Sequence, residues 1–360
     1  MMPEQPDLTS QLRISHPTID LDGRDNPSLA QGLLSLSIVE QTSGLYRCEA
    51  TFGNWGPRSG SIDFLYFDRQ TLDFGKTLKI KIESDVLFEG RITALEGHFA
   101  EAREPEIAVL AEDRFQDLRM TRRTRTFDDV SDSDVFNRIA NDHGLSPSVD
   151  VSGPNYRVLA QINQSDLAFL RERARAIDAE LWMDGSTLNV KSHSNRGGSP
   201  IELGYGRNLH SFNVLADLAQ QRTSVAVNGW DVAGKSGLQY EAAESAVSSE
   251  LNGDTSGISI LQSAFGARKE ALAHAVPLNS GEAQALAEAY FKLSARRFVV
   301  GRGRADTDPK LQVGAQVNIK NVGPLFSGKY YLTEVRHLFD LAQGLRTEFT
   351  AERPGIGRAQ

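Results

Sequence analysis

Cysteine is almost absent from the 360-residue sequence, which contains only Cys48. A single cysteine excludes an intrachain disulfide and fits either a reducing compartment or indifference to redox state. No apolar run approaches the roughly 18 residues of a transmembrane helix, and the first residues contain no apolar stretch typical of a signal peptide. We therefore expect a chain that does not insert into a membrane by itself.

Motifs of common catalytic sites are also lacking: no HExxH, GxSxG, P-loop or CxxC occurs. DTSG at 254–257 lacks the glycine spacing of an aspartic-protease turn. Asp20, Asp22 and Asp25 offer too few oxygen ligands for a calcium loop, so both segments are interpreted as turns. GRGRAD at 301–306 lacks the third glycine of a dinucleotide fingerprint. We predict no enzyme, and no catalytic, cofactor-binding or metal-binding residues.

An excess of positive charge is lacking: 39 Lys and Arg stand against 47 Asp and Glu, which gives a net charge of −8. This argues against a dedicated nucleic-acid binder, whose surface is usually basic. The one basic run, RMTRRTRTF at 119–127, could bind an anionic partner or could be a solvated strand balanced by the aspartates that follow it. We favour the balanced strand or a protein interface, and the candidate interface residues are Arg119, Arg122, Arg123 and Arg125.

Residues 1–115 are predicted to form a mainly β domain. GLLSLSIVE, RCEATF and KTLKIKIE each alternate apolar with polar residues, which is typical of half-buried strands. Turn-forming segments such as GNWGPRSG separate them. Strands at this spacing indicate an antiparallel barrel or sandwich.

Residues 116–200 are predicted to form a small α+β domain. A helix is expected over 131–144, where Ser131 and Asp134 make a capping-box pair, and another over 165–180, capped by Ser165. LWMDGSTLNVK then predicts a hairpin that turns at Asp184-Gly185.

Residues 201–353 are predicted to return to β structure, with 354–360 as a tail. RTSVAVNGWDV indicates a strand, and the Ala-, Ser-, Glu- and Gly-rich segment 236–260 is interpreted as a mobile loop. An inserted helix is expected to begin at a Ser280 cap, with its core face formed by Leu286, Ala289, Tyr290 and Leu293.

The chain contains an internal repeat. LFEGRITAL at 87–95 resembles LFSGKYYLTEV at 325–335, and the similarity extends to a preceding glycine, Gly75 or Gly314, and to a final arginine, Arg114 or Arg353. The repeat indicates two related β-modules, one toward each end of the chain.

Two pairs of residues lie in similar contexts of the repeat. His98 and His337 are interpreted as equivalent strand-end histidines with a shared structural role. Trp55 and Trp230, each beside a glycine, are expected to pack in a core or at a barrel rim, with an interface anchor as the alternative.

Several segments in order resemble one family. These include EDRFQDLRMTRRTRTFDDVSDSDVFNRIANDHGL, INQSDLAFLRERARAIDAELWMDGSTLNVK, VAVNGWDV, NSGEAQALAEAYF and SGKYYLTEVRHLFD. Over roughly 10–353 the chain resembles the phage late control D proteins, which are tail-hub proteins, and the N-terminal part of VgrG-type spike proteins.

The resemblance implies two tail-tube-like antiparallel β-barrels, produced by internal duplication, on either side of the α+β domain. It implies a homotrimer that joins a six-fold tail tube to a three-fold spike, with baseplate wedge proteins as further partners. The sequence ends soon after Arg353, so the spike is expected to be a separate protein, unless the sequence is cut before a spike domain. We expect assembly in the bacterial cytoplasm and a final place at the tail tip or baseplate.

Two other function classes remain open at this point. A tail-associated peptidoglycan hydrolase needs an acid–base carboxylate pair or a metal triad, and the motif search finds neither. A carbohydrate-binding module needs clustered exposed aromatics, and three Trp and eight Tyr are spread along the chain. The sequence does not distinguish a phage tail from a tailocin or another injection system.

Overall fold

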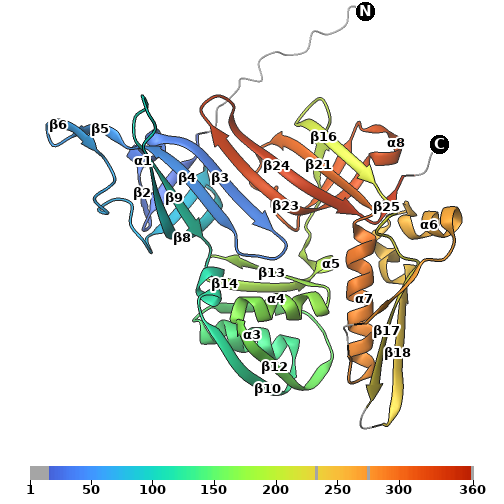
Figure 1. Ribbon diagram of the computed structural model, residues 1–360. Helices are drawn as coiled ribbons and strands as arrows, with labels where there is room; N and C mark the ends of the chain where they lie inside the picture. Colours follow the sequence, from blue (N-terminus) through green and yellow to red (C-terminus); the bar gives the residue numbers. More distant parts are fainter. Residues whose placement is uncertain (1–15, 232–233, 274–275, 358–360) are drawn as a thin grey trace, which may run out of the picture.

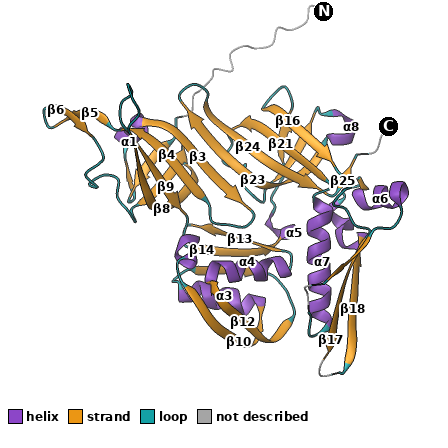
Figure 2. Cartoon of the chain, in the orientation of Figure 1, coloured by secondary structure: helices purple, strands orange, loops and turns teal. Residues whose placement is uncertain are grey.

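The structure is a computed structural model that describes residues 16–231, 234–273 and 276–357. A thirteen-stranded sheet extends across the top of the molecule in Figure 1, and two smaller units hang below it. Strands dominate, and helices concentrate in the lower units (Figure 2). No helix in the described part of the chain is long and apolar enough to cross a membrane. The mainly β class predicted from the sequence is confirmed.

The first sheet module is the part of this sheet that comes from the N-terminal third of the chain. Its core contains Ile38, Phe52, Ile80 and Val109, all fully buried, because alternate residues of each strand face inward. Its strands are β1 (Thr18–Leu21), β2 (Arg24–Asp25), β3 (Leu33–Gln41), β4 (Arg47–Gly53), β7 (Thr77–Ile82), β8 (Asp85–His98) and β9 (Glu106–Glu112). Helix α1 (Pro27–Gly32) and the hairpin β5 (Trp55–Arg58) and β6 (Ser61–Phe64) are attached to it.

The second sheet module comes from the C-terminal part of the chain. Its core includes Val317, Ile319, Leu332 and Ala351, which are fully buried. Its strands are β15 (Ile201–Gly204), β16 (Leu209–Ala216), β21 (Val299–Asp306), β22 (Gln316–Lys320), β23 (Gly328–Asp340) and β24 (Gly344–Arg353), followed by β25 (Gly355–Ile356), with helix α8 (Gly323–Phe326) between β22 and β23.

The middle unit lies below the first sheet module (Figure 1). Its elements are α2 (Phe115–Arg119), β10 (Arg122–Ser131), α3 (Asp132–Asp142), β11 (Ser146–Asp150), β12 (Asn155–Ser165), α4 (Asp166–Ala176), β13 (Ala179–Asp184), β14 (Thr187–Ser192) and α5 (His193–Arg196). The predicted helix starts are confirmed: Ser131 and Asp134 form a full capping box, and Ser165 caps α4. The predicted hairpin turn is confirmed at Gly185, whose φ is +54°.

A fourth unit, the inserted unit, is formed by the segment of the chain between β16 and β21, and it has its own core. Its elements are β17 (Ser224–Asp231), β18 (Ser236–Ala243), η1 (Glu244–Glu250), β19 (Thr255–Ser256), α6 (Gly257–Phe265), β20 (Lys269–Leu272) and α7 (Ser280–Arg296). The prediction of a mobile loop over 236–260 is therefore wrong. The segment has few apolar residues, so its sequence did not indicate ordered structure. It is ordered by its contacts, since β18 pairs with β17 along its length and Val247 is fully buried.

The prediction for the long helix α7 is also corrected in two details. The N-cap is Asn279, whose side chain accepts a hydrogen bond from the backbone of Glu282. Of the four residues predicted to face the core, Ala289 is buried and Leu286 packs partly buried against the core, whereas Tyr290 and Leu293 are exposed. The rest of the core face is formed by Ala283, Ala287 and Phe291. Alanine does not stand out in an apolar periodicity, so these small core residues were not predicted.

The same strand pairing occurs in both sheet modules. The order β3-β4-β9-β8-β7 of the first is repeated as β16-β21-β24-β23-β22 in the second. Each copy has a register shift at one threonine, Thr93 between Ile92 and Ala94 and Thr333 between Leu332 and Glu334. The hydroxyl of Thr93 donates to the Leu110 carbonyl at 3.3 Å, and that of Thr333 donates to the Thr350 carbonyl at 3.4 Å.

Two further irregularities of the strand ladders occur at equivalent positions in the two modules. The β3–β4 ladder shifts between Leu33 and Ser35, and the β16–β21 ladder shifts between Leu209 and Ser211. In each module a glycine of positive φ donates to the residue before the threonine bulge: Gly75 to Ile92 at 2.8 Å and Gly314 to Leu332 at 2.9 Å.

When the two modules are aligned on these bulges, Phe88 is equivalent to Gly328. The similar sequences LFEG and LFSG are therefore offset by two residues from the structural alignment.

The two modules are joined into one sheet by β3 and β23. These strands pair antiparallel from Glu334 opposite Gln41 to Asp340 opposite Ser35. Figure 1 shows β3 and β23 side by side at the centre of the sheet. Strand β23 therefore crosses from one core to the other, and Phe339 lies in the core of the first module.

Candidate functional site at the meeting point of the units

A buried polar cluster ties three of the four units together. Glu180 of β13 accepts hydrogen bonds from His193 Nδ1 at 2.8 Å, Arg196 Nη1 at 2.8 Å and Tyr331 Oη at 2.7 Å. Arg196 Nη2 also donates to Tyr46 Oη at 2.7 Å. Tyr46 belongs to the first module, Glu180 to the middle unit and Tyr331 to the second module. One arginine–glutamate pair therefore fixes the positions of three units.

The charges in this cluster stabilise each other. Burial alone raises the pKa of Glu180, but the His193 hydrogen bond and the Arg196 charge outweigh it, so the pKa is lowered below its usual range. Burial lowers the pKa of Arg196, yet its anionic and phenolic neighbours raise the net value. Burial and the adjacent Glu180 charge raise the pKa of Tyr331. Glu180 and Arg196 are therefore an ion pair at neutral pH.

The position of Arg196 is set by close packing on two sides. Its guanidinium carbon lies 4.2 Å from the centroid of the Trp182 ring. On its other side is Gly314, with φ +93°, where an added Cβ would come within 2.3 Å of Arg196 Nε. Glycine is required at 314 both for its backbone conformation and for this approach.

A second ion group attaches the inserted unit. Arg296 at the end of α7 donates to Glu250 Oε2 at 2.8 Å and to Asp178 Oδ2 at 2.7 Å. Burial opposes its charge, but these two carboxylates raise its pKa above the usual range. Asp178 belongs to the middle unit, so Arg296 links two units as Arg196 links three.

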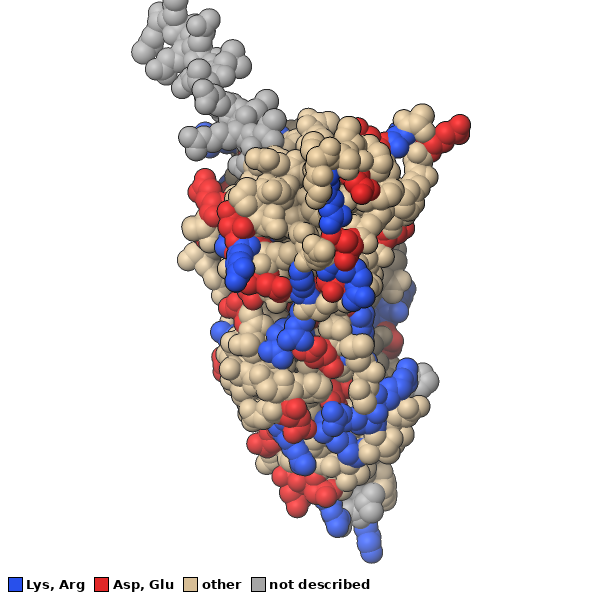
Figure 3. Space-filling view, turned by 90° about the vertical axis from the view of Figure 1, so that its left-hand side faces the viewer, with Lys and Arg blue, Asp and Glu red and all other residues tan. Residues whose placement is uncertain are grey.

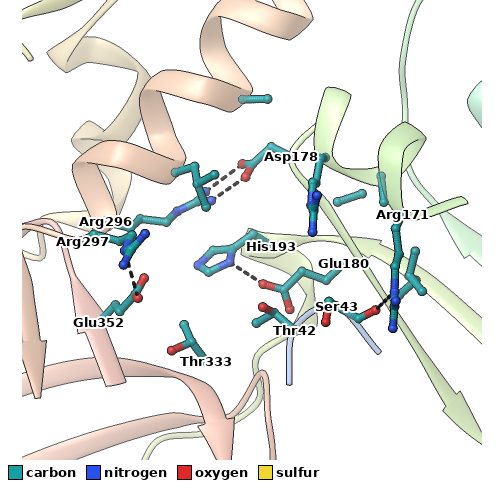
Figure 4. Close-up of a pocket in the computed structure, with 16 residues that line it drawn as sticks. Thr42, Ser43, Arg171, Asp178, Glu180, His193, Arg296, Arg297, Thr333 and Glu352 are labelled. Carbon is teal, nitrogen blue, oxygen red and sulfur yellow. Dashed lines mark hydrogen bonds and ion pairs between the residues drawn. The ribbon is translucent and has the colours of Figure 1, made fainter. Parts of the chain in front are cut away.

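A cavity of about 280 Å³ lies between these two groups. Figure 4 shows His193 directed at Glu180, Arg296 at Asp178 and Arg297 at Glu352. Arg171 closes one side by donating to the backbone carbonyls of Ser43 at 2.6 Å and Gly44 at 3.0 Å. Two of these pairs, Arg296–Asp178 and Arg297–Glu352, cross unit boundaries, which is an arrangement suited to holding the units in fixed positions.

Two buried carboxyl groups lie on another side of the same joint. Glu40 accepts from the backbone N–H of Val313 at 2.9 Å, and Asp113 accepts from those of Tyr46 at 2.8 Å and Phe115 at 2.9 Å. Burial raises the pKa of each to about 7. With His337, whose pKa burial lowers to about 4, they line a cavity of about 300 Å³.

The predicted arginine run is mostly occupied within the chain. Arg119 pairs with Glu112, and Arg123 Nε lies 3.2 Å from Asp166 Oδ2. Arg125 Nη2 donates to Asp166 Oδ1 at 2.8 Å, whereas Arg122 donates to the exposed carbonyl of Asn163 at 2.9 Å. The balancing acids are thus residues other than the aspartates that follow the run. On the face seen in Figure 3, basic and acidic side chains lie side by side.

Two predicted equivalences are wrong. His337 is buried and its Nδ1 is 2.9 Å from Thr347 Oγ1, whereas His98 is half-buried beside Glu96 and Glu106. The threonine bulges align His337 with Gly97, and a shift of one residue reverses the face of a strand.

Trp55 and Trp230 are 40% and 54% exposed and lie in unrelated hairpins, β5–β6 and β17–β18, so their predicted equivalence and core packing are wrong, whereas the rim and interface-anchor alternatives stay predictions.

The turn predicted at 20–25 is confirmed, because Asp22 and Gly23 both adopt positive φ between β1 and β2. The turn predicted for the DTSG segment is wrong, because Thr255–Ser256 forms β19 and α6 begins at Gly257. Asp254 of this segment pairs with Arg353 at 3.1 Å, and Ser256 caps α6. Among the described residues, no group of three or more His, Cys, Asp or Glu is placed to hold a metal ion.

The residues of the central joint were not identified from the sequence. Tyr46, Glu180, Arg196 and Tyr331 stand far apart in the chain and no short motif contains two of them at fixed spacing. Only Gly314 gave a signal, because it aligned with Gly75 in the repeat.

Comparison with known proteins identifies a family that matches most of the chain. The family described as the Alg8 N-terminal domain matches residues 59–340. The chain belongs to this family. The description of the family assigns no activity to this chain. No curated protein sequence matches the chain.

Several solved structures have a fold similar to that of this chain. The 43 kDa tail protein of prophage MuSo2 from Shewanella oneidensis is 12% identical, with a TM-score of 0.70 over 94% of this chain and 98% of that one. A tail protein from Neisseria meningitidis is 12% identical, with a TM-score of 0.66 over 95% and 97%.

An Escherichia coli component of the type VI secretion system, described as structurally similar to the T4 tail proteins gp27 and gp5, is 11% identical, with a TM-score of 0.57 over 91% of this chain and 76% of that one. At these identities the likeness shows a shared fold.

Proposed function

We propose that this protein is a structural hub of a contractile phage tail or phage-like injection particle, of the late control D and VgrG N-terminal kind. The fold shared with two phage-type tail proteins and with a type VI secretion component supports a tail-associated structural role. The joint described above supports a mechanical task, because its buried charges link the units to one another.

The observation that carries the proposal is the repeated strand pattern. The described strands of the two modules form one open sheet and not the two closed barrels predicted from the sequence. Their shared five-strand order and bulges would nonetheless make them two tail-tube-like β-modules, derived by duplication, on one polypeptide. Three such chains present six similar modules but only three-fold symmetry. A homotrimer would therefore meet a six-fold tail tube on one face and a three-fold spike on the other.

The partners follow from this geometry. We propose the tail tube protein, a spike and baseplate wedge proteins, with assembly in the bacterial cytoplasm and a final place at the tail tip. No nucleic-acid-specific contact and no enzymatic step are part of the proposal. The arginine run stays a proposed protein contact, and Arg122 is its best candidate because it donates to a backbone carbonyl at the surface, that of Asn163.

Sedimentation equilibrium of the purified chain tests the proposal. The expected result is a self-association that ends at three times the 39.5 kDa chain mass. A protein that stays monomeric up to about 100 μM, roughly the range where weak specific contacts become visible, and that is not recruited by tail tube or spike proteins, would contradict it.

A further inference from the structure

The two sheet modules differ in how their edges are used. Strand β3 is paired on both sides, by β4 and by β23. Its counterpart β16 is paired along its length by β21 alone among the described residues. In the same way, β23 is paired with β22 over its first residues and with β3 over Glu334–Asp340. Its counterpart β8 is paired with β7 up to Arg91, and Ala94–His98 has a described partner only in β9.

Here, joint means the strand pairing between two modules and not the polar cluster described above. The chain contains one complete joint of this kind and the two separate halves of a second one. The complete joint is β3 on β23. The halves are the open edge of β16, equivalent to β3, and the open edge of β8 at Ala94–His98, equivalent to β23. Strand β16 is the last strand at one end of the sheet, and β8 lies in the first module, with six strands between them; Figure 1 shows them on opposite sides of the β3–β23 pair. They cannot pair within one chain, but they can pair between chains.

We propose, resting on the hub function above, that β16 of one copy pairs antiparallel with Ala94–His98 of a second copy in the register of the β3–β23 joint. The bulges fix that register. In the intrachain joint Arg336 is opposite Val39 and Leu338 is opposite Ser37. The equivalent pairs between copies are Glu96 with Leu215 and His98 with Asn213.

Two exposed rings mark the open joint as an interface. The intrachain joint buries Phe339, which is 2% exposed, and Val313, which is 3% exposed. Their counterparts on the first module are Phe99, which is 67% exposed, and Phe74, which is 54% exposed. Large apolar residues at positions that are buried in the closed joint indicate that a partner covers them in the assembly.

Phe99 is the anchor in this arrangement. Phe339 is two positions beyond His337 on β23 and faces Leu36 of β3. The counterpart of Leu36 on β16 is Phe212, so Phe99 would pack on Phe212 of the second copy. Phe212 and Val214 are only partly buried against the core of their own module, so part of each side chain is accessible for this contact. Phe67, whose ring centroid is 5.4 Å from that of Phe99, supports the ring from its own chain.

Cysteine cross-linking of the full chain tests the register. Cys48 is buried, so introduced thiols on the surface react selectively. The double variant Glu96→Cys/Leu215→Cys, treated with a short bis-thiol reagent, is expected to give covalent dimers and trimers. Val39→Cys/Arg336→Cys is the positive control and gives a cross-link within one chain. Glu96→Cys/Asn213→Cys is the off-register control and is expected to give at least tenfold less product.

A second variant tests the anchor. Phe99→Ala is expected to weaken self-association at least tenfold, whereas Ile162→Ala, at an equally exposed site of the middle unit, leaves it unchanged. A trimer that cross-links equally in both registers, or in neither, overturns this inference and leaves the hub function standing. A chain that is monomeric and unrecruited overturns both.

Discussion

Phe339 and Phe99 occupy the same position in the two sheet modules, yet the first is buried in the core of the other module and the second is exposed to solvent. Phe339 also makes an edge contact with His16, with ring centroids 4.6 Å apart. One residue position therefore serves packing inside the chain in one module and, in the account given above, packing between chains in the other.

The two phenylalanines are expected to differ in their effect on the monomer. Phe339→Ala should lower the free energy of unfolding by about 3–5 kcal/mol, because it leaves a cavity in a closed core. Phe99→Ala should change it by less than about 0.5 kcal/mol, as for an exposed site. Urea titrations followed by circular dichroism at dilute protein concentration measure both. Equal losses in the two variants would show that the bulges have been aligned incorrectly.

The central ion pair predicts strong coupling. Glu180→Gln removes the negative charge that pairs with the buried Arg196 and leaves it only neutral acceptors, the amide oxygen and the Tyr46 hydroxyl. Removing one charge of a buried pair costs about 3–5 kcal/mol. Arg196→Met should cost a similar amount. The double variant should be clearly more stable than the sum of the two losses implies, and denaturant titrations of the four proteins give this coupling energy. Additive losses would mean that the two groups do not stabilise each other.

Local patterns in the sequence sufficed for the elements of the middle unit, but not for the way the units meet. The capping box at Ser131 and the turn at Gly185 depend on neighbours in the chain, so they could be predicted. The burial of Tyr331 against Glu180 depends on contacts between residues 151 apart, which no periodicity encodes. The repeat was visible through Gly75 and Gly314, but its register was not, since bulges at Thr93 and Thr333 leave no mark in the letters.

The buried Glu40 predicts a pH-dependent difference between the wild type and Glu40→Gln. Its pKa is raised to about 7 by burial, so the folded state binds the proton more tightly than the unfolded state. The resulting stabilisation is fully present below pH 4.5, the ordinary value, and is lost as the pH rises through 7. Glutamine is neutral at every pH and its oxygen can still accept from Val313, so the variant does not lose it.

The variant should therefore match the wild type near pH 4.5 and exceed it by up to about 3 kcal/mol at pH 8, since each pKa unit corresponds to about 1.4 kcal/mol. Asp113 and His337 titrate in both proteins, and taking the difference removes most of their effect. Unfolding titrations at pH 5, 6, 7 and 8 measure it. A difference that is constant with pH would mean that Glu40 is ionised in the fold.

Gly314 predicts a substitution effect that a simple turn glycine does not show. Gly314→Ala meets both a positive φ and Arg196 at 2.3 Å, so it should displace the guanidinium and destabilise by more than about 3 kcal/mol. Gly206→Ala, at φ +79° with nothing within 4 Å, should cost only about 1–2 kcal/mol. Thermal unfolding of the two variants compares them, and equal costs would show that the approach to Arg196 is not tight.

The measurement that tests the central claim most directly is cryo-electron microscopy of the assembled chain without imposed symmetry. The account predicts a closed ring of three copies that contains six similar β-modules, in which the density of β16 continues into β8 of the next copy. A ring of six chains, or three chains that meet through other surfaces with β16 open, would contradict it.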